Sequence, residues 1–275
     1  MPELPEVDLV ARQLQRLLKG RTIETAKLIR ARLAPSTTPA VFSRRLRDST
    51  FTEVRRRGKY ILIEFDISHT LLVHLRMSGR FMLLDEEDEN PKFAHAVFQL
   101  TDGQRLVFDD QRHFGLMKIV KTNEIASSPE IAKLAPEPFS EEFTVDQFHR
   151  SLKAARRTLK EFLLDQTKVT GLGNIYAAEV MYAAGVHPSV KANRISRPRA
   201  ERLFSAIELT LRQALKMSKR GKLDPRNING NYAPENGRWL VYGREGKPCE
   251  TCSNMIKRIT HAGRSTYFCP VCQRR

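Results

Sequence analysis

Four cysteines constrain this chain more than any other feature. They are Cys249, Cys252, Cys269 and Cys272, all within the last 27 residues, with the spacing C-x2-C-x16-C-x2-C. Each C-x2-C pair places two sulfurs on one turn, and four thiolates suit tetrahedral Zn²⁺. Disulfides are the alternative, but a cytosolic chain keeps its thiols reduced. The spacing therefore predicts one structural Zn²⁺, because four thiolates leave no open position for water.

The segment between the two cysteine pairs has the pattern of a β-hairpin. Apolar and polar residues alternate on both sides of Gly263, from Lys257 to Phe268. This predicts a hairpin that the zinc ion clips at its base, with Arg264 near the tip. A rigid tip that carries an arginine is suited to contact a phosphate or a nucleic-acid groove. An ordinary surface arginine is the alternative.

Charge is distributed as unevenly as cysteine. The chain has 275 residues and a formal net charge of +16; residues 1–140 carry +3 (22 basic, 19 acidic) and residues 141–275 carry +13 (25 basic, 12 acidic). A basic half of this kind suggests a polyanionic partner, first of all nucleic acid. A generically basic soluble protein is the alternative.

Neither a membrane span nor a signal peptide is expected. No stretch of about 18 apolar residues occurs, and the start MPELPEVDLV has acids where a signal peptide has a basic region. The expected compartment is therefore the cytoplasm.

Periodicity divides the chain into segments of different texture. Residues 2–19 have helical spacing and end at Gly20. Short apolar runs then predict an antiparallel sandwich or barrel; they cover 22–30, 51–56, 59–66, 70–77, 80–84, 94–101, 104–109 and 115–120. Helical periodicity returns over about 145–220. Residues 221–238, rich in Gly, Asn and Pro, predict a long loop, and strands around the zinc knuckles are expected from Trp239 on.

The N-terminus offers a nucleophile. Removal of the initiator Met would expose Pro2 as a secondary amine, and an α-amino group has a pKa near 8. Such an amine can attack an aldehyde carbon and form an iminium, which favours elimination beside it. Glu3 could move the protons. Taken alone, the first six residues favour the simpler alternative, in which proline starts a helix and Glu3 complements its dipole.

Two further motifs suit phosphate. Arg55–Tyr60, with Gly58 and Lys59, lies between two strand-like runs and clusters cations at a tight turn. Val169–Tyr176 places two glycines before a helix start, where backbone N–H groups and Asn174 can bind an anion. A solvated charged turn and an ordinary helix–helix connection are the respective alternatives.

In combination these motifs are far more specific. PELPEV, RRRGKY, HLRMSG (74–79), DDQRHFG (109–115), LLDQTKVTGLGNIYAAEV (163–180) and the four-cysteine hairpin occur in one order. The sequence closely resembles the bacterial formamidopyrimidine-DNA glycosylases and their endonuclease VIII relatives over nearly its whole length. The resemblance implies an α+β protein with two domains: an N-terminal β-sandwich with flanking helices, and a helix–two-turns–helix domain plus a four-cysteine zinc-finger β-hairpin.

The domain boundaries follow from the segments and the resemblance together. Residues 1–125 are expected to form the catalytic sandwich, 126–142 a linker, 143–238 the helix–two-turns–helix domain and 239–275 the zinc-finger hairpin. The loop at 221–238 is expected to read the lesion.

The resemblance also implies roles for single residues. Pro2 would be the nucleophile at C1′, Glu3 the acid/base, Lys59 the lysine of β-elimination and Arg264 the arginine of δ-elimination. The trio that fills the gap left by an everted base would be Met77, Arg112 and Phe114, and ordinary core packing is the alternative for Met77 and Phe114. Phosphate contacts are implied for His74, His95, Arg156, Lys160 and Asn174.

The implied function is a DNA repair glycosylase with AP lyase activity. A base must be flipped out of the duplex before C1′ can be attacked, and apolar wedges can occupy the vacated stack. The expected partner is double-stranded damaged DNA, bound by a monomeric, bacterial-type, nucleoid-associated enzyme.

One departure leaves the lesion open. The glycine- and threonine-rich loop typical of enzymes that excise 8-oxoguanine is missing from residues 220–232. Endonuclease VIII-like specificity for pyrimidines, or for another adduct, is therefore an alternative. A non-catalytic zinc-ribbon DNA-binding protein is a more distant one.

Overall fold

The computed structural model describes residues 2–218, 223–229 and 239–275. The chain forms two compact units, the first comprising residues 1–132 and 218–232 and the second residues 133–217 and 233–275. Among the described residues, no helix is both long and apolar enough to cross a membrane.

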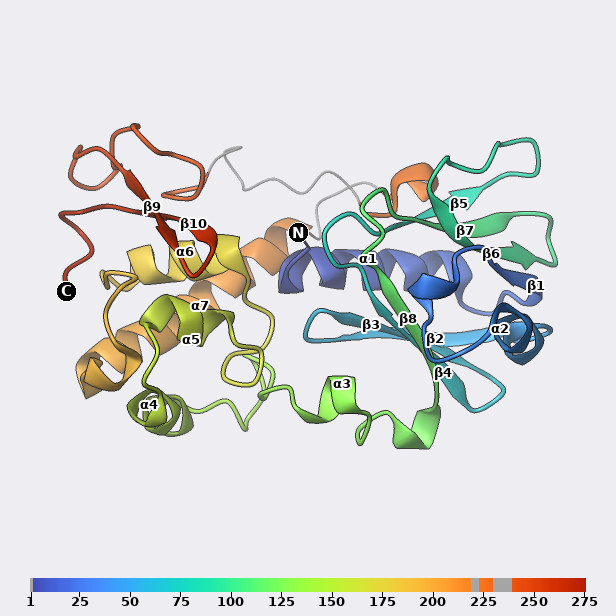
Figure 1. Cartoon of the computed structure of the whole chain (residues 1–275), viewed down its shortest axis with the longest axis horizontal. Coiled ribbons are helices and arrows are strands. Elements are labelled where there is room, and N and C mark those ends of the chain that lie inside the picture. The colour runs from blue at the N-terminus through green and yellow to red at the C-terminus, as the bar shows by residue number, and fades with distance from the viewer. Residues whose placement is uncertain (1, 219–222, 230–238) are drawn as a thin grey trace. The chain divides into compact units, whose positions relative to one another are not determined.

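The first unit is built around two four-stranded antiparallel sheets (Figure 1). One sheet has the order β1-β6-β7-β5 and the other β2-β3-β4-β8. The strands are β1 (Ile23–Leu28), β2 (Phe51–Arg57), β3 (Tyr60–Phe65), β4 (His69–His74), β5 (Arg80–Leu84), β6 (Ala94–Leu100), β7 (Arg105–Asp109) and β8 (Leu116–Lys121). All eight apolar runs are strands, so the predicted antiparallel β-architecture is confirmed.

Helix α1 (Leu4–Leu18) packs against this β-architecture. Its start is a capping box, in which the Glu3 side chain accepts from the Glu6 backbone N–H and Glu6 returns the bond to the Glu3 N–H at 2.8 Å. The apolar stripe of Val7, Leu14 and neighbouring residues lies in the core of the unit. The predicted N-terminal helix is therefore confirmed.

Two local features differ from the sequence expectation. The strand expected over 70–77 ends at His74, because residues 75–79 turn back with a bond from the Gly79 N–H to the Leu75 carbonyl. Helix α2 (Pro39–Leu46) was missed, although Thr38 caps it by accepting from the Val41 N–H at 3.3 Å. Thr-Pro at a helix start was the available signal. The remaining short elements of the unit are η1 (Ala31–Leu33), η2 (Thr122–Glu124) and α3 (Pro129–Ala132).

The loop expected at 221–238 is only partly described, and its described part is anchored. Residues 225–227 form the 3-10 helix η4 (Pro225–Asn227), which packs against β5. Ile228 is fully buried in the core of the first unit. The expectation of one long loop is corrected for residues 223–229, because Ile228 supplies an apolar anchor. Residues 221–222 and 230–238 lie outside the described part.

The second unit is helical and ends in the zinc-binding tail. Its elements are α4 (Val145–Ala154), α5 (Leu159–Leu164), α6 (Asn174–Ala183), η3 (Ala192–Arg194), α7 (Arg197–Ser218), β9 (Lys257–His261) and β10 (Arg264–Phe268). The helices confirm the periodicity seen over about 145–220. In the described tail only the hairpin β9–β10 is stranded, and the cysteine knuckles themselves are turns.

Candidate functional site

The first candidate group, the Glu3 carboxylate, lies at the N-terminal end of α1. The Glu3 side chain is 1 % exposed, and it lies where the N-terminal end of the helix dipole favours a carboxylate. Pro2 directly precedes it and is partly exposed. Pro2, whose nitrogen would become a secondary amine on removal of Met1, and the Glu3 carboxylate are therefore neighbours at the start of α1.

Lys59 lies in the tight turn between β2 and β3. Gly58 adopts a φ of +58°, which a glycine tolerates without strain, and its carbonyl accepts from Arg56 at 2.9 Å. The Lys59 side chain is 7 % exposed. A buried lysine at a turn is held in one position rather than moving freely in solvent.

Contacts between α1 and β2 bring these groups to one end of the first unit. The Gln15 side chain accepts from the Val54 N–H. Nearer the N-terminus of α1, the Asp8 carboxylate lies 3.6 Å from the Arg56 guanidinium. Residues of α1 that are closer to its N-terminus therefore contact residues of β2 that are closer to Gly58. Pro2 and Glu3 therefore lie toward the same end as the Gly58–Lys59 turn.

His74 ends strand β4 beside that turn. Burial, with the positive charges of Arg76 and Lys59, lowers its pKa to about 3. Its Nδ1 accepts from the Arg76 N–H at 3.0 Å, and its ring packs edge-on to Tyr60 at 4.7 Å. His74 is thus a neutral imidazole at physiological pH, so its expected phosphate contact would be a hydrogen bond and not an ion pair.

Met77, Arg112 and Phe114 lie on two turns of the first unit. Met77 is 45 % exposed and Phe114 is 48 % exposed, so neither is the core residue that the alternative reading required. The Arg112 guanidinium stacks over the Phe114 ring at 5.3 Å. An exposed Met and an exposed Phe–Arg stack provide apolar and planar surface of the kind that can enter a base stack.

His95, another expected phosphate contact, packs against a second histidine. It is buried, its Nε2 lies 2.9 Å from Nδ1 of His113, and the two rings stack at 5.0 Å. Burial and the charge of Arg30 lower its pKa. In this arrangement His95 supports His113, and its direct contact with phosphate stays a prediction.

In the second unit, helices α5 and α6 flank the glycine-containing segment 165–173. Gly173 caps α6, and Gln166 organises the turn by accepting from the Gly171 N–H at 3.0 Å and donating to the Leu172 carbonyl at 2.9 Å. Asn174 begins α6 and donates to the Ser265 carbonyl at 3.0 Å. The glycine-rich turn and the zinc-finger hairpin are therefore bound to each other through Asn174.

Lys160 supports the same hairpin from α5. Its ammonium is fully buried and donates to the Ser265 carbonyl at 3.1 Å and to the Thr266 hydroxyl. Burial, and then the charge of Arg264, lower its pKa to about 8. Lys160 holds strand β10 from beneath, so its direct contact with phosphate stays a prediction. Arg156 is exposed just before α5.

Arg264 begins β10 directly after the hairpin turn. Ala262 and Gly263 both have positive φ, and His261 pairs with Arg264 across the turn. The Arg264 side chain is exposed, while the next residue is fixed by Lys160 and Asn174. The predicted hairpin with Arg264 near its tip is therefore confirmed.

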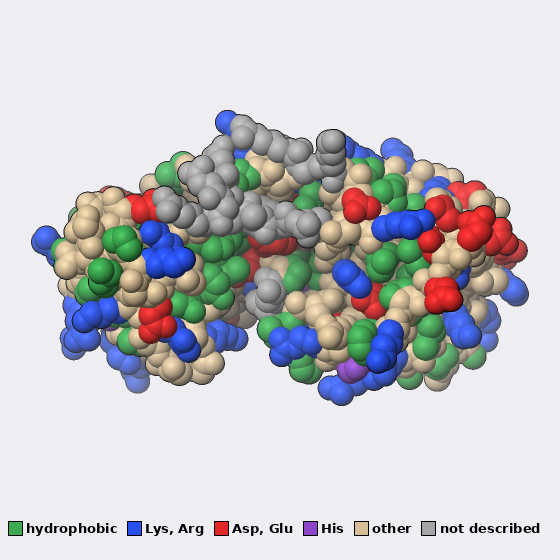
Figure 2. Space-filling model, turned by 90° about the horizontal axis from the view of Figure 1, so that it is seen from above, with side chains coloured by type: hydrophobic (Ala, Val, Ile, Leu, Met, Phe, Trp, Pro, Cys, Tyr) green, Lys and Arg blue, Asp and Glu red, His purple; other side chains and the backbone are tan. Residues whose placement is uncertain are grey.

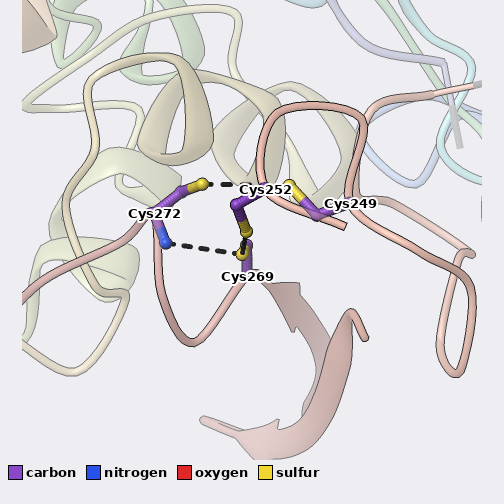
Figure 3. A group of neighbouring side chains, drawn as sticks. All are labelled: Cys249, Cys252, Cys269 and Cys272. Atoms are coloured by element: carbon purple, nitrogen blue, oxygen red, sulfur yellow. Dashed lines mark hydrogen bonds between the residues drawn. The ribbon is translucent and has the colours of Figure 1, made fainter. Parts of the chain in front are cut away.

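The four cysteines form one cluster (Figure 3). Their sulfurs all lie within 4.8 Å of one another, with 3.4 Å between Cys252 and Cys269 and 3.8 Å between Cys249 and Cys272. Four ligands at a Zn–S distance of about 2.3 Å would have sulfurs about 3.8 Å apart, so the cluster fits tetrahedral zinc. The cysteine set holds one structural Zn²⁺, as its spacing predicted.

Several polar residues that shape these sites were missed from the sequence. Gln166 and the fully buried Asp110 both lie within sequence motifs, but residue type and spacing indicate no role for either side chain. Glu179 is also buried, and its carboxylate accepts from the backbone N–H groups of 240, 241 and 242 at 2.9 to 3.0 Å. Polar residues amid apolar ones were the only signal, and it does not reveal the partner.

Comparisons with known proteins agree with this architecture part by part. Three family models match in order: the formamidopyrimidine-DNA glycosylase N-terminal domain at residues 1–117, the H2TH domain of the same glycosylases at 134–224, and a zinc finger found in FPG and IleRS at 246–275. These define a class of DNA glycosylases with a helix–two-turns–helix domain and a zinc finger.

Full-length relatives extend the match. The chain is 38% identical over 274 residues to formamidopyrimidine-DNA glycosylase of Bacillus subtilis, covering 99% of both chains, and 37% identical to that of Listeria innocua, covering 100% of both. It also superposes on the Lactococcus lactis enzyme bound to DNA containing N7-benzyl-Fapy-dG, with a TM-score of 0.92, 31% identity and full coverage of both chains. The chain belongs to the formamidopyrimidine-DNA glycosylase family.

Proposed function

We propose that this protein excises oxidised or ring-opened bases from duplex DNA and then cleaves the strand as an AP lyase. The observation that carries the proposal is the full-length relationship to formamidopyrimidine-DNA glycosylases at up to 38% identity among the relatives above. Solved complexes of the similar Lactococcus lactis protein contain DNA with an abasic site or with an oxidised pyrimidine.

The proposed chemistry begins with a free Pro2 amine. Its nitrogen lone pair forms a bond to C1′ while the glycosidic bond breaks, and the base leaves with the electrons of the broken glycosidic bond and takes a proton from water. The Glu3 carboxylate accepts the proton that the Pro2 nitrogen loses and passes it to the ring oxygen as the C1′–O bond opens, which leaves a Pro2 iminium at C1′. Support comes from Glu3, which is buried at the helix head beside Pro2.

Strand cleavage follows from the iminium, which withdraws electrons from C2′. Loss of a C2′ proton expels the 3′ phosphate in β-elimination, and a second elimination expels the 5′ phosphate. We assign Lys59 to the first step and Arg264 to the second. Met77, Arg112 and Phe114 are proposed to occupy the space left by the everted nucleotide. His74, His95, Arg156, Lys160 and Asn174 are proposed to bind or support the DNA backbone.

Borohydride trapping tests the reaction. Reduction should convert the iminium to a stable amine, so wild-type protein with a free Pro2 should form a covalent complex with duplex DNA containing an abasic site. Pro2→Gly should trap severely less, while Pro5→Gly, at the next proline of the same helix start, is the matched control. A wild-type protein that traps nothing, with its N-terminus verified by mass spectrometry, would refute the lyase and favour a non-catalytic DNA-binding protein.

Lesion preference is a separate part of the proposal. Ring-opened and oxidised purines are the first candidates, and oxidised pyrimidines are the second because residues 220–232 lack the Gly-Gly-Thr-Thr pattern. Excision rates across a panel of duplexes, each with one lesion opposite each normal base, distinguish them. Faster excision of the pyrimidine lesions would establish endonuclease VIII-like specificity.

We also propose that the protein acts as a monomer in the cytoplasm, associated with the nucleoid through DNA. One abasic site needs one Pro2, one zinc finger and one helix–two-turns–helix motif, all of which a single chain contains. Light scattering should give the mass of one chain, 31.6 kDa. A stable dimer at nanomolar concentration would contradict the monomer.

A further inference from the structure

Asp110 lies beneath the two turns that carry Met77, Arg112 and Phe114. It follows strand β7 directly and is fully buried. Both carboxylate oxygens accept hydrogen bonds from these turns, so one buried side chain contacts both segments.

The first turn, residues 75–79, reaches Asp110 through Ser78. The Ser78 hydroxyl donates to Oδ1 of Asp110, and the Ser78 oxygen in turn accepts from the Arg112 N–H at 3.1 Å. Ser78 therefore bridges the turn that carries Met77 to the turn that carries Arg112. The two turns are 34 residues apart in sequence.

The second turn, residues 111–115, wraps around the same carboxylate. Oδ1 accepts from the Arg112 N–H at 3.3 Å, and Oδ2 accepts from the Gly115 N–H at 2.7 Å. The Asp110 carbonyl also accepts from the His113 N–H at 3.2 Å. The backbone of Phe114 lies between these bonded positions and is therefore held with the turn.

Two glycines allow both turns to close onto one aromatic ring. A Cβ on Gly79 would lie 2.7 Å from Cζ of Phe108, and a Cβ on Gly115 would lie 2.8 Å from Cε1 of the same ring. Real Cβ atoms do not approach so closely, so only glycine fits at these two positions. Phe108 is fully buried. The turns therefore share an apolar floor as well as a carboxylate.

We propose that Asp110, with Ser78, is a positioning residue that sets the geometry of the base-stack wedge as one rigid body. The inference rests on the proposed roles of Met77, Arg112 and Phe114. A wedge must hold its shape while it displaces a stacked nucleotide, and a buried carboxylate that accepts several hydrogen bonds resists that force. Without the Asp110 carboxylate, the two turns could move apart when the wedge enters the base stack. The free-energy barrier to eversion of the nucleotide would then rise.

Asp110→Asn tests the proposal with little change in volume. An asparagine offers one oxygen and one NH₂ group, so an N–H donor would face either the Gly115 N–H or the Ser78–Arg112 donors. Asp109→Asn is the matched control, because Asp109 is the neighbouring buried carboxylate but pairs with Arg80 at 2.8 Å within the sheet. Ser78→Ala removes only the bridge between the turns and provides a milder variant.

The readout separates eversion from chemistry. Excision from a lesion duplex, and the fluorescence of 2-aminopurine placed beside the lesion, report on eversion. Cleavage of a single-stranded oligonucleotide with a preformed abasic site reports on lyase chemistry, which needs no wedge. For Asp110→Asn we expect the rate of duplex excision and the rate of the 2-aminopurine fluorescence change to fall about 10- to 100-fold. Lyase activity on the single-stranded oligonucleotide should stay within about twofold of wild type. Ser78→Ala should show a smaller loss of the same pattern.

Two outcomes would overturn the inference. One is equal loss of duplex and single-strand activity in both Asp110→Asn and the milder Ser78→Ala. The other is duplex excision by Asp110→Asn at the rate of Asp109→Asn. If wild-type protein itself traps no abasic DNA, the proposed function fails instead, and 2-aminopurine fluorescence on binding still tests the wedge.

Discussion

At the scale of single residues, position and chemistry combine in ways that residue type does not reveal. His74 is a histidine that stays neutral because it is largely buried and because Arg76 and Lys59 lie beside it. Lys160 is a lysine whose ammonium donates a hydrogen bond to the Ser265 carbonyl inside the second unit.

His74 makes stability depend on pH. Its pKa is about 3 in the folded state and near 6.5 when unfolded, so below pH 6.5 the unfolded chain binds a proton that the folded chain does not. The contribution of neutral His74 to the free energy of unfolding is thus present above pH 6.5 and is lost as pH falls toward 3. We expect the stability advantage of wild type over His74→Gln to shrink by about 2 kcal/mol between pH 7 and pH 5, measured by urea unfolding. His69→Gln, at the other end of β4, is the control, and equal profiles for the two variants would contradict the prediction.

Lys160 should make DNA affinity depend on pH at the alkaline side. Its ammonium is charged below about pH 8 and neutral above it, so the positive field at the hairpin is lost as pH rises through 8. We expect wild-type affinity for duplex DNA to fall over pH 7–9, whereas Lys160→Met binds more weakly at pH 7 and shows a flatter profile. Lys153→Met, on the exposed part of α4, is the control. A steep profile retained in Lys160→Met would refute the assignment.

At the scale of elements, small anchors decide where whole segments lie. The segment 223–229 is bound to the edge strand β5: the Phe81 N–H donates to Oδ1 of Asn229 at 3.2 Å, and its Nδ2 donates to the Gly79 carbonyl at 3.1 Å. Arg226 adds an ion pair with Asp88 at 2.9 Å. The root of the proposed lesion-reading loop is therefore tied to the turn that carries Met77.

Ile228 should be the strongest of these anchors. It is fully buried, so Ile228→Ala should cost about 2 to 5 kcal/mol in the unfolding of the first unit. Leu223→Ala, in the same segment but 37% exposed, should stay within about 0.5 kcal/mol of wild type. Denaturant unfolding followed by circular dichroism measures both. Similar losses in the two variants would show that the segment is not anchored through Ile228.

Removal of zinc should alter the zinc-finger hairpin of the second unit and leave the β-sheets of the first unit intact. The single tryptophan, Trp239, packs edge-on against Tyr176 at 5.4 Å, so its emission reports on the second unit. Chelation should shift that emission and weaken DNA binding because the four thiolates lose the zinc ion that they bind together. The β-strand signal of the first unit in circular dichroism should persist. Unchanged affinity after verified zinc loss would count against a role for the hairpin in binding.

At the scale of the whole molecule, charge bears on affinity more than on chemistry. Lys and Arg side chains are spread over both units on the face drawn in Figure 2, whereas acidic side chains gather mainly on the first unit. This matches the division of net charge along the sequence. Of the proposed catalytic groups, Pro2, Glu3 and Lys59 lie in the nearly neutral part of the sequence, where Glu3 and Lys59 are buried, and Arg264 lies in the basic part.

Salt should therefore weaken binding steeply. Each neutralised phosphate releases counterions, so the logarithm of the affinity should fall linearly with the logarithm of salt concentration. Arg264→Ala should reduce that slope by about one, and Arg226→Ala, whose charge pairs with Asp88, should leave it unchanged. Fluorescence anisotropy over a salt series measures the slope. A flat response in wild type would contradict the proposed phosphate contacts.

The eight strands, the first helix, the zinc cluster and the hairpin with Arg264 could be predicted from the sequence, because each depends on spacing within a few residues or on a known ligand pattern. The sequence did not predict that Ile228 is a core residue, that Lys160 lies under a strand 105 positions away or that Asp110 joins two turns; these are seen in the fold. Such contacts depend on which distant groups share one desolvated space. A local pattern does not encode that, because a buried polar residue has the same letter whether its partner is water, a backbone carbonyl or another turn.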